Sequence, residues 1–158
     1  MTKQYAVEVS GIDFAAAHFI SEGGKCECLH GHNYQVTVVV EGDLDAQGMV
    51  IDFRVLKKHL RQLCQDWDHR VLLPTRSKLI TVERKGTQIH AVTPGGAYSF
   101  PASDVVLLDV IETTTEQMAQ ILCQTLGEML KSQFSNISKL SVILAESPTS
   151  RALVSLEL

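Results

Sequence analysis

The sequence lacks the features that mark several common classes of protein. It has no block of basic residues, and 14 Lys and Arg against 18 Asp and Glu give a net charge of -4, which argues against a nucleic-acid or membrane-surface protein. It has no uncharged apolar run long enough to cross a bilayer, and its start shows no basic and apolar leader pattern. We therefore expect a cytoplasmic protein that acts on a small molecule.

Cysteine is also scarce. The four cysteines are Cys26, Cys28, Cys64 and Cys123, and they form no C-x-x-C pair. Without a secretory context this number predicts free thiols in a reducing compartment rather than a disulfide framework. Cys64 and Cys123 fall among apolar positions with helical spacing, so we expect them in the core.

The apolar content of 45% is enough for one domain, residues 1–158, to bury a core without covalent staples. Alternating apolar and polar residues over 4–10 and 33–41 predict two antiparallel strands. The first strand pattern breaks at Gly11 and then resumes, which places His18 near a strand end before a turn.

Helical patterns occupy two later segments. Asp52 is a plausible N-cap for a helix that ends near residues 66–69, because the apolar positions after it recur at steps of three and four. Thr113 followed three residues later by Glu116 predicts a capping box that opens a second helix.

Short strands are predicted in the remaining segments. Residues 74–104 contain several β-like runs between Gly and Pro turns, typical of a β-rich insertion on the main fold. Residues 139–145 and 152–158 predict two final strands. The order β-β-α-(β insertion)-α-β-β indicates an α+β fold, in which two helices cover one face of an antiparallel sheet.

The segment 25–34 is the densest in reactive groups. In an extended chain His30 and His32 leave on the same face with Cα atoms roughly 6.6 Å apart, so both can bind one metal ion. A structural site that also used Cys26 and Cys28 would need ligands about 20 Å apart to converge, which requires the segment to fold on itself. His18 is the best placed third ligand, and three protein ligands leave a position open for substrate.

Three further groups are candidates for chemistry. A thiol at Cys26 or Cys28 beside a metal would have a lowered pKa and can act as a base or nucleophile. His69 can be held in one tautomer by Asp68, although adjacent side chains usually point apart. Glu146 interrupts an apolar strand, and it is either solvated or, if buried, suited to a ligand with paired N–H donors.

Several short motifs follow one another along nearly the whole chain outside residues 74–104. They are Phe14-x-Ala16-Ala17-His18, Cys26-x-x-x-His30-Gly31-His32-Asn33-Tyr34, Gly48-Met49-Val50-x-Asp52-Phe53, Asp68-His69, Thr114-x-Glu116 and Glu146. Together they resemble the family of 6-pyruvoyl tetrahydropterin synthase and 6-carboxy-5,6,7,8-tetrahydropterin synthase, which are zinc-dependent lyases.

The resemblance implies the tunnelling fold, whose subunits join their sheets into a ring, commonly a homohexamer of two trimers with active sites at subunit interfaces. It also implies Zn²⁺ on three histidines, a cysteine base and a catalytic Asp-His pair. The matching residues are His18, His30 and His32 for zinc, Cys26 for the base, and Asp68 with His69 for the pair.

The implied substrate is 7,8-dihydroneopterin triphosphate. Glu146 matches the glutamate that anchors the pterin ring, and Thr114 and Thr115 would complete that pocket. The leading expectation is formation of 6-carboxy-5,6,7,8-tetrahydropterin, acetaldehyde and triphosphate on the route to 7-deazaguanine and queuosine.

Other members of the family give other products. One type forms 6-pyruvoyl tetrahydropterin, and a folate type forms 6-hydroxymethyl-7,8-dihydropterin with a glutamate near the cysteine. The order Cys26-Glu27-x-x-His30-Gly31-His32 fits members that carry both residues, so Glu27 keeps the folate reaction open.

The sequence also departs from the family pattern. Its usual Pro-Thr-x-Glu begins here with Thr113, Cys28 is an extra thiol, and residues 74–104 are an additional segment, so a non-catalytic pterin- or metal-binding ring protein is the alternative of a different class. Candidate groups for the triphosphate are Lys25, Arg54 and Arg151.

Overall fold

The computed structural model describes residues 4–158 and is built around a long antiparallel hairpin. Strand β1 (Tyr5–His18) pairs with β2 (His30–Gly42) along its length, apart from one bulge. Gly11 lies in this bulge with a φ of 75°, in the left-handed region that glycine adopts without strain. This bulge explains why the alternation breaks at Gly11.

The expectation from the sequence that the chain has no leader rests partly on residues 1–3, which lie outside the described residues.

The main sheet has the strand order β7-β3-β1-β2-β8-β9. Strands β8 (Ile137–Ser147) and β9 (Ser150–Glu157) continue it antiparallel beyond β2, as the sequence predicted. Strands β3 (Arg70–Pro74) and β7 (Val105–Leu108) extend the other side in parallel. The sequence did not predict these two strands, because short, continuous apolar runs carry no period-two signal.

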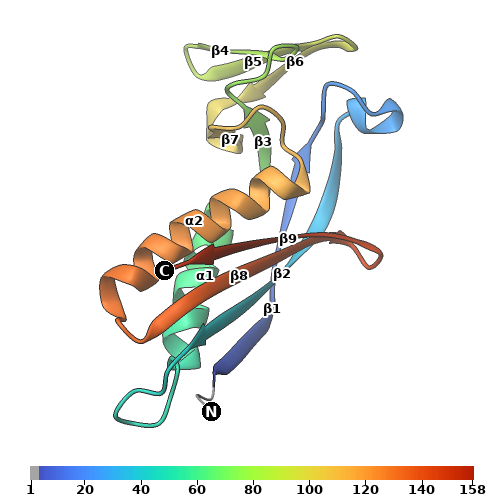
Figure 1. Ribbon diagram of the computed structural model, residues 1–158. Helices are drawn as coiled ribbons and strands as arrows, with labels where there is room; N and C mark the ends of the chain where they lie inside the picture. The colour runs from blue at the N-terminus through green and yellow to red at the C-terminus, as the bar shows by residue number, and fades with distance from the viewer. Residues whose placement is uncertain (1–3) are drawn as a thin grey trace.

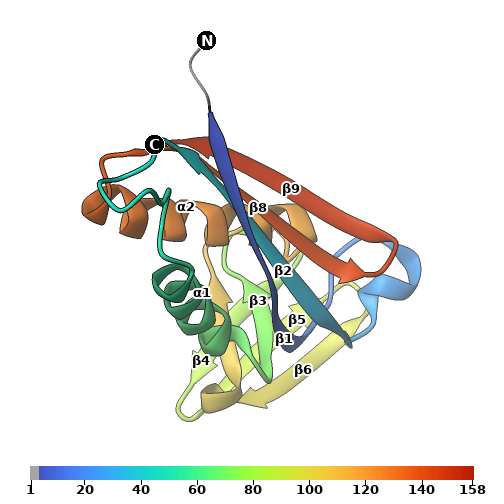
Figure 2. The same ribbon diagram turned by 90° about the horizontal axis from the view of Figure 1, so that it is seen from below.

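Two helices cover one face of this sheet, as expected (Figure 2). Helix α1 (Phe53–Trp67) packs against β1 and β3, and α2 (Thr115–Gln133) packs against β8 and β9. The carboxylate of Asp52 accepts from the Arg54 N–H, which confirms the first N-cap. No helix within residues 4–158 is long and apolar enough to cross a membrane. The core residues between helices and sheet include Phe14, Val38, Leu60, Leu126 and Leu144.

The start of α2 corrects the predicted capping box by one residue. Thr114 is the N-cap, and its hydroxyl accepts from the backbone N–H of Gln117 at 3.4 Å. Thr113 is instead fully buried, and its hydroxyl donates to the carbonyl of Phe19. Three consecutive threonines made the cap position ambiguous in the sequence, because any of them is an acceptable N-cap.

A second, three-stranded antiparallel sheet stands at one end of the molecule (Figure 1). It consists of β4 (Thr81–Lys85), β5 (Gln88–Thr93) and β6 (Gly96–Pro101), followed by the short 3₁₀ helix Ala102–Asp104. These strands lie within residues 74–104, where the sequence predicted short strands between turns.

This smaller sheet packs against the chain immediately after β1. Phe19 is completely buried there and stacks on Tyr98 with ring centroids 4.9 Å apart, and Tyr98 stacks in turn on Phe100 at 5.9 Å. The other buried members of this second core are Leu73, Ile80, Ile89 and Ala91. The insertion thus fixes the residue that follows His18.

Replacing Tyr98 by alanine tests this attachment. Tyr98→Ala should lower the free energy of unfolding by about 2 kcal/mol, because it removes a half-buried ring from the stack on Phe19. Tyr98→Phe keeps the ring and should stay within about 0.5 kcal/mol of the parent protein. Urea denaturation measures both values, and equal losses for the two variants would contradict a role for the stacked ring.

Candidate functional site

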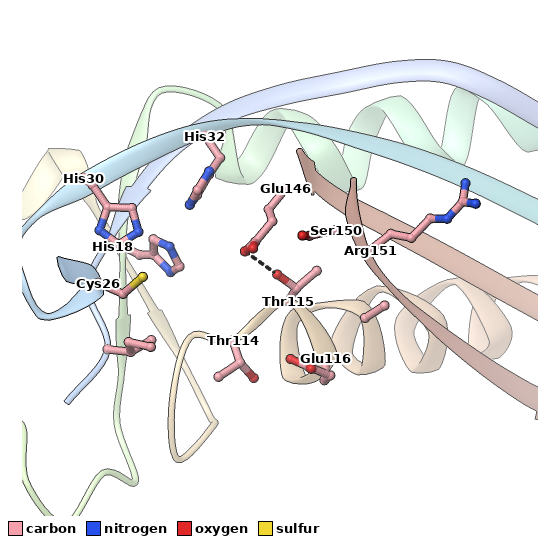
Figure 3. A pocket seen from close by; sticks show the side chains of 12 residues that line it. His18, Cys26, His30, His32, Thr114, Thr115, Glu116, Glu146, Ser150 and Arg151 are labelled. Carbon is pink, nitrogen blue, oxygen red and sulfur yellow. Dashed lines mark hydrogen bonds between the residues drawn. The ribbon is translucent and has the colours of Figure 1, made fainter. Parts of the chain in front are cut away.

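The hairpin of β1 and β2 brings three histidines together. His18 and His30 are direct cross-strand partners, and His32 faces Ala16 one step further along the same side. Directly opposed side chains such as those of His18 and His30 have Cβ atoms roughly 5 Å apart. One nitrogen from each ring lies within 4.8 Å of the others (Figure 3). The structure therefore confirms that the three histidines named from the sequence meet at one point.

Backbone carbonyls orient two of these rings. The Nδ1 of His18 lies 2.8 Å from the Thr113 carbonyl oxygen, and the Nδ1 of His30 lies 2.7 Å from that of Cys28. A carbonyl only accepts, so each Nδ1 carries a hydrogen, and in the neutral imidazole the lone pair is then on Nε2. This is the usual support of metal-binding histidines.

Burial also keeps His18 in the form that binds metals. It lowers the pKa of His18 to about 4, with a further contribution from the neighbouring His30, while the bond to Thr113 opposes the shift. The imidazole is therefore neutral at neutral pH. Three imidazole nitrogens with room for a further ligand fit an ion such as Zn²⁺, so this cluster can hold a metal ion.

The histidines lie at one end of a pocket of about 270 Å³. Cys26 enters it from the 3₁₀ helix Gly24–Glu27. The Cys26 carbonyl accepts from the Ile20 N–H at 3.0 Å, which ties this loop to the end of β1. The lining residues are His18, Ile20, Cys26, His30, His32, Thr114, Thr115, Glu116, Glu146, Ser150, Arg151 and Ala152.

A carboxylate marks another part of the same pocket. Glu146 projects from β8, half-buried, and its Oε2 accepts from the Thr115 hydroxyl at 2.8 Å (Figure 3). Thr115 is the first residue of α2, so the helix start fixes the carboxylate. One donor leaves further acceptor positions on its two oxygens, which suits a ligand with paired N–H groups.

Asp68 and His69 lie outside this pocket. Their side chains meet at 2.9 Å because His69 has a φ of 58°, a left-handed conformation that overcomes the tendency of adjacent side chains to diverge. The Ala15 N–H, together with His69, holds the pKa of Asp68 below its usual range. His69 lines a second cavity, of about 470 Å³, that shares only His32 with the first.

Two other groups of predicted residues also separate. Glu27 does not line the pocket, because its carboxylate turns back and accepts from the Gly23 N–H at 3.2 Å. Of the basic candidates for the triphosphate, only Arg151 lines the pocket, and Arg54 instead pairs with Asp52 at 2.7 Å.

The sequence reasoning missed Tyr34 as a neighbour of the site. Its hydroxyl lies 3.4 Å from the Nε2 of His18, and burial raises its pKa. The signal was available, because Tyr34 follows His32 by two residues on the same strand face. Ser150 and Ala152 were also missed, since their approach depends on the turn that returns β9 along β8.

The cysteines divide into two pairs. Cys26 and Cys28 are exposed, whereas Cys64 and Cys123 are buried in the helices, as the sequence predicted. Burial raises the pKa of Cys64 to about 12 and also raises the pKa of Cys123. The exposed thiols are the ones available for chemistry.

Known proteins resemble this chain in both sequence and structure. The family model described as 6-pyruvoyl tetrahydropterin synthase matches residues 7–157. A protein of Methanocaldococcus jannaschii named as a putative 6-carboxy-5,6,7,8-tetrahydropterin synthase is 30% identical over 139 residues, which cover 87% of this chain and 85% of that protein.

Among solved structures, the 6-pyruvoyl tetrahydropterin synthase of Plasmodium falciparum superposes with a TM-score of 0.90 at 32% identity, covering 99% of this chain and all of that one. The corresponding protein of Plasmodium vivax gives 0.91 at 29% identity with the same coverage. Two variants of the latter are described as catalytic-residue mutants, in which a glutamate is replaced by cysteine or alanine.

The depressed pKa of His18 predicts a pH dependence of the metal-free protein. The folded value of about 4 lies below the ordinary 6.5, so the unfolded chain binds the proton first. The free energy of unfolding should therefore fall by up to about 3 kcal/mol between pH 6.5 and 4. In His18→Gln this part of the slope should be missing. Urea denaturation in EDTA measures it, and parallel slopes for the two proteins would refute the assignment.

Proposed function

Because the chain belongs to the 6-pyruvoyl tetrahydropterin synthase family, we propose that it converts 7,8-dihydroneopterin triphosphate and water to 6-carboxy-5,6,7,8-tetrahydropterin, acetaldehyde and triphosphate. Its fold is the tunnelling fold expected from the resemblance. The observation that carries the proposal is a single pocket lined by three histidines, Cys26 and Glu146. This reaction leads toward 7-deazaguanine and queuosine.

The pterin ring would bind at Glu146. An aminopyrimidinone presents neighbouring N–H donors, which a carboxylate accepts as a pair. Thr115 holds that carboxylate by a bond of 2.8 Å, and Thr114 lines the pocket beside it. A ring seated there would extend its side chain toward the histidines.

The histidine cluster would hold Zn²⁺, since its donors fit that ion. When bound, zinc polarises oxygen atoms and makes neighbouring protons more acidic. Cys26 lines the pocket beside the histidines and would remove or return protons on the substrate side chain. A reducing cytoplasm would keep this exposed thiol available.

We propose that the chain forms a homohexamer of two trimers. In this assembly Asp68 and His69 would act on the pocket of a neighbouring subunit. Two features support an oligomer. Within residues 4–158, two strand edges have no strand partner. They are the outer edge of β9 and, up to Ala15, the edge of β1 that faces away from β2. Such edges favour pairing with another chain. The Asp68–His69 pair also lies outside the pocket that it would serve.

The folate-type reaction, formation of 6-hydroxymethyl-7,8-dihydropterin, is the second candidate. It is favoured by Glu27, which directly follows Cys26 in the 3₁₀ helix, and by the catalytic glutamate of the similar Plasmodium vivax protein. In this reaction Glu27 would release Gly23 and turn toward the substrate.

Identifying the product separates these reactions. Purified, zinc-loaded protein is incubated with 7,8-dihydroneopterin triphosphate, and the pterin product and any acetaldehyde are identified. 6-Carboxy-5,6,7,8-tetrahydropterin together with acetaldehyde supports the proposal, whereas 6-pyruvoyl tetrahydropterin or the hydroxymethyl product replaces it. Absence of turnover by zinc-loaded protein would favour a non-catalytic pterin-binding role.

The separate roles of Cys26 and His30 give a paired prediction. Cys26→Ala should reduce turnover by a factor of at least about 100, because it removes the proton-transferring group, and should keep about one zinc ion per chain. His30→Ala should lose the zinc. Metal analysis after gel filtration measures both, and loss of zinc from Cys26→Ala would show that Cys26 is a ligand.

Glu27 discriminates between the two candidate reactions. Glu27→Gln should reduce formation of the hydroxymethyl product by a factor of about 100 or more if that carboxylate moves protons. Formation of the carboxy product should change much less, because Glu27 does not line the pocket. Chromatographic quantification of both products from one incubation gives the answer, and an equal fall in both would contradict this division of roles.

A further inference from the structure

Two adjacent residues, Glu112 and Thr113, form hydrogen bonds to the chain where it leaves β1. They precede α2 and lie beside the segment 18–21, although more than 90 residues separate the two segments in sequence. Thr113 is completely buried, but it does not line the pocket. No step of the proposed reaction uses its side chain.

Glu112 and Thr113 form hydrogen bonds to three of the four residues in the segment 18–21. The Thr113 carbonyl accepts from His18 at 2.8 Å, and the Thr113 hydroxyl donates to the Phe19 carbonyl at 3.2 Å. The Glu112 carboxylate accepts from both the backbone N–H, at 3.1 Å, and the hydroxyl of Ser21. Thr113 therefore holds the His18 ring with one atom and the following peptide with another.

The opposite side of this segment is packed by the insertion. Phe19 has no exposed surface and stacks on Tyr98. Its carbonyl has little freedom to move because its side chain is enclosed. The hydroxyl of Thr113 thus ties a rigid peptide to the carbonyl group that orients the imidazole of His18.

We propose that Thr113 is a positioning residue for the metal centre, whose hydroxyl sets the distance between the Phe19 peptide and the carbonyl that orients His18. The proposal rests on the proposed function, because it assumes that the histidines bind metal. Without the hydroxyl, the buried Phe19 carbonyl would lose its partner and the Thr113 peptide would be free to shift. The Nε2 of His18 would then leave the position shared with the other two ligands.

Thr113→Val tests this role, because it keeps the side-chain shape and removes the hydroxyl. The zinc dissociation constant, measured by competition with a chromophoric chelator, should rise about tenfold, the lower range for losing a group that orients a ligand. The visible absorption spectrum of the Co²⁺-loaded protein should also change, because it reports ligand geometry. Thr113→Ser keeps the hydroxyl and should restore both properties.

Thr75→Val is the matched control, because the Thr75 hydroxyl also donates to a backbone carbonyl, that of Leu108 at 3.1 Å, without contacting a histidine. It should bind zinc within about twofold of the parent protein, a change of about 0.4 kcal/mol. If Thr113→Val fails to fold, Thr113→Ala carries the same expectation.

Three outcomes separate the role of Thr113 from the existence of the metal site itself. Weaker zinc binding and an altered Co²⁺ spectrum in Thr113→Val alone support the proposal. An unchanged dissociation constant and spectrum overturn it and leave the metal site intact. If the parent protein itself binds neither zinc nor cobalt, the metal site fails and the role of Thr113 fails with it.

Discussion

The pocket depends on giving a buried imidazole an acceptor for one of its two nitrogens. His18 is buried at the end of β1, and the Thr113 carbonyl is the acceptor for its Nδ1. This single bond selects the tautomer and turns the other nitrogen toward His30 and His32. Burial then keeps the ring uncharged. Geometry and protonation thus have one common cause, the enclosure of the strand end.

The same stretch of chain organises the carboxylate side of the pocket. Thr113 contacts His18, the next residue caps α2, and Thr115 binds Glu146. Successive peptide units cover only a few ångströms, so the separation of the two functional groups is set mainly by covalent geometry at a helix start. The smaller sheet stiffens this arrangement by enclosing Phe19.

The sequence predicted the parts of the site that depend on local periodicity. His30 and His32 face one side because strands alternate, and this holds whatever surrounds them. The parallel pairing of β3 and β7 could not be predicted, because it depends on contacts between segments that carry no alternation. Asp68 and His69 were named as a candidate pair, but the left-handed backbone of His69 that brings their side chains together could not be predicted. The sequence therefore showed which residue types could take part in the site, but not which distant strands would pair.

The burial of two cysteines confines thiol reactivity to one loop. Cys64 and Cys123 are enclosed, with raised pKa values, so alkylating reagents and mild oxidants at neutral pH will meet only Cys26 and Cys28 while the chain is folded. Labelling of Cys64 and Cys123 therefore reports unfolding. Labelling of Cys26 and Cys28 reports whether the loop beside the histidines is covered. The native thiols thus serve as two independent probes in one molecule.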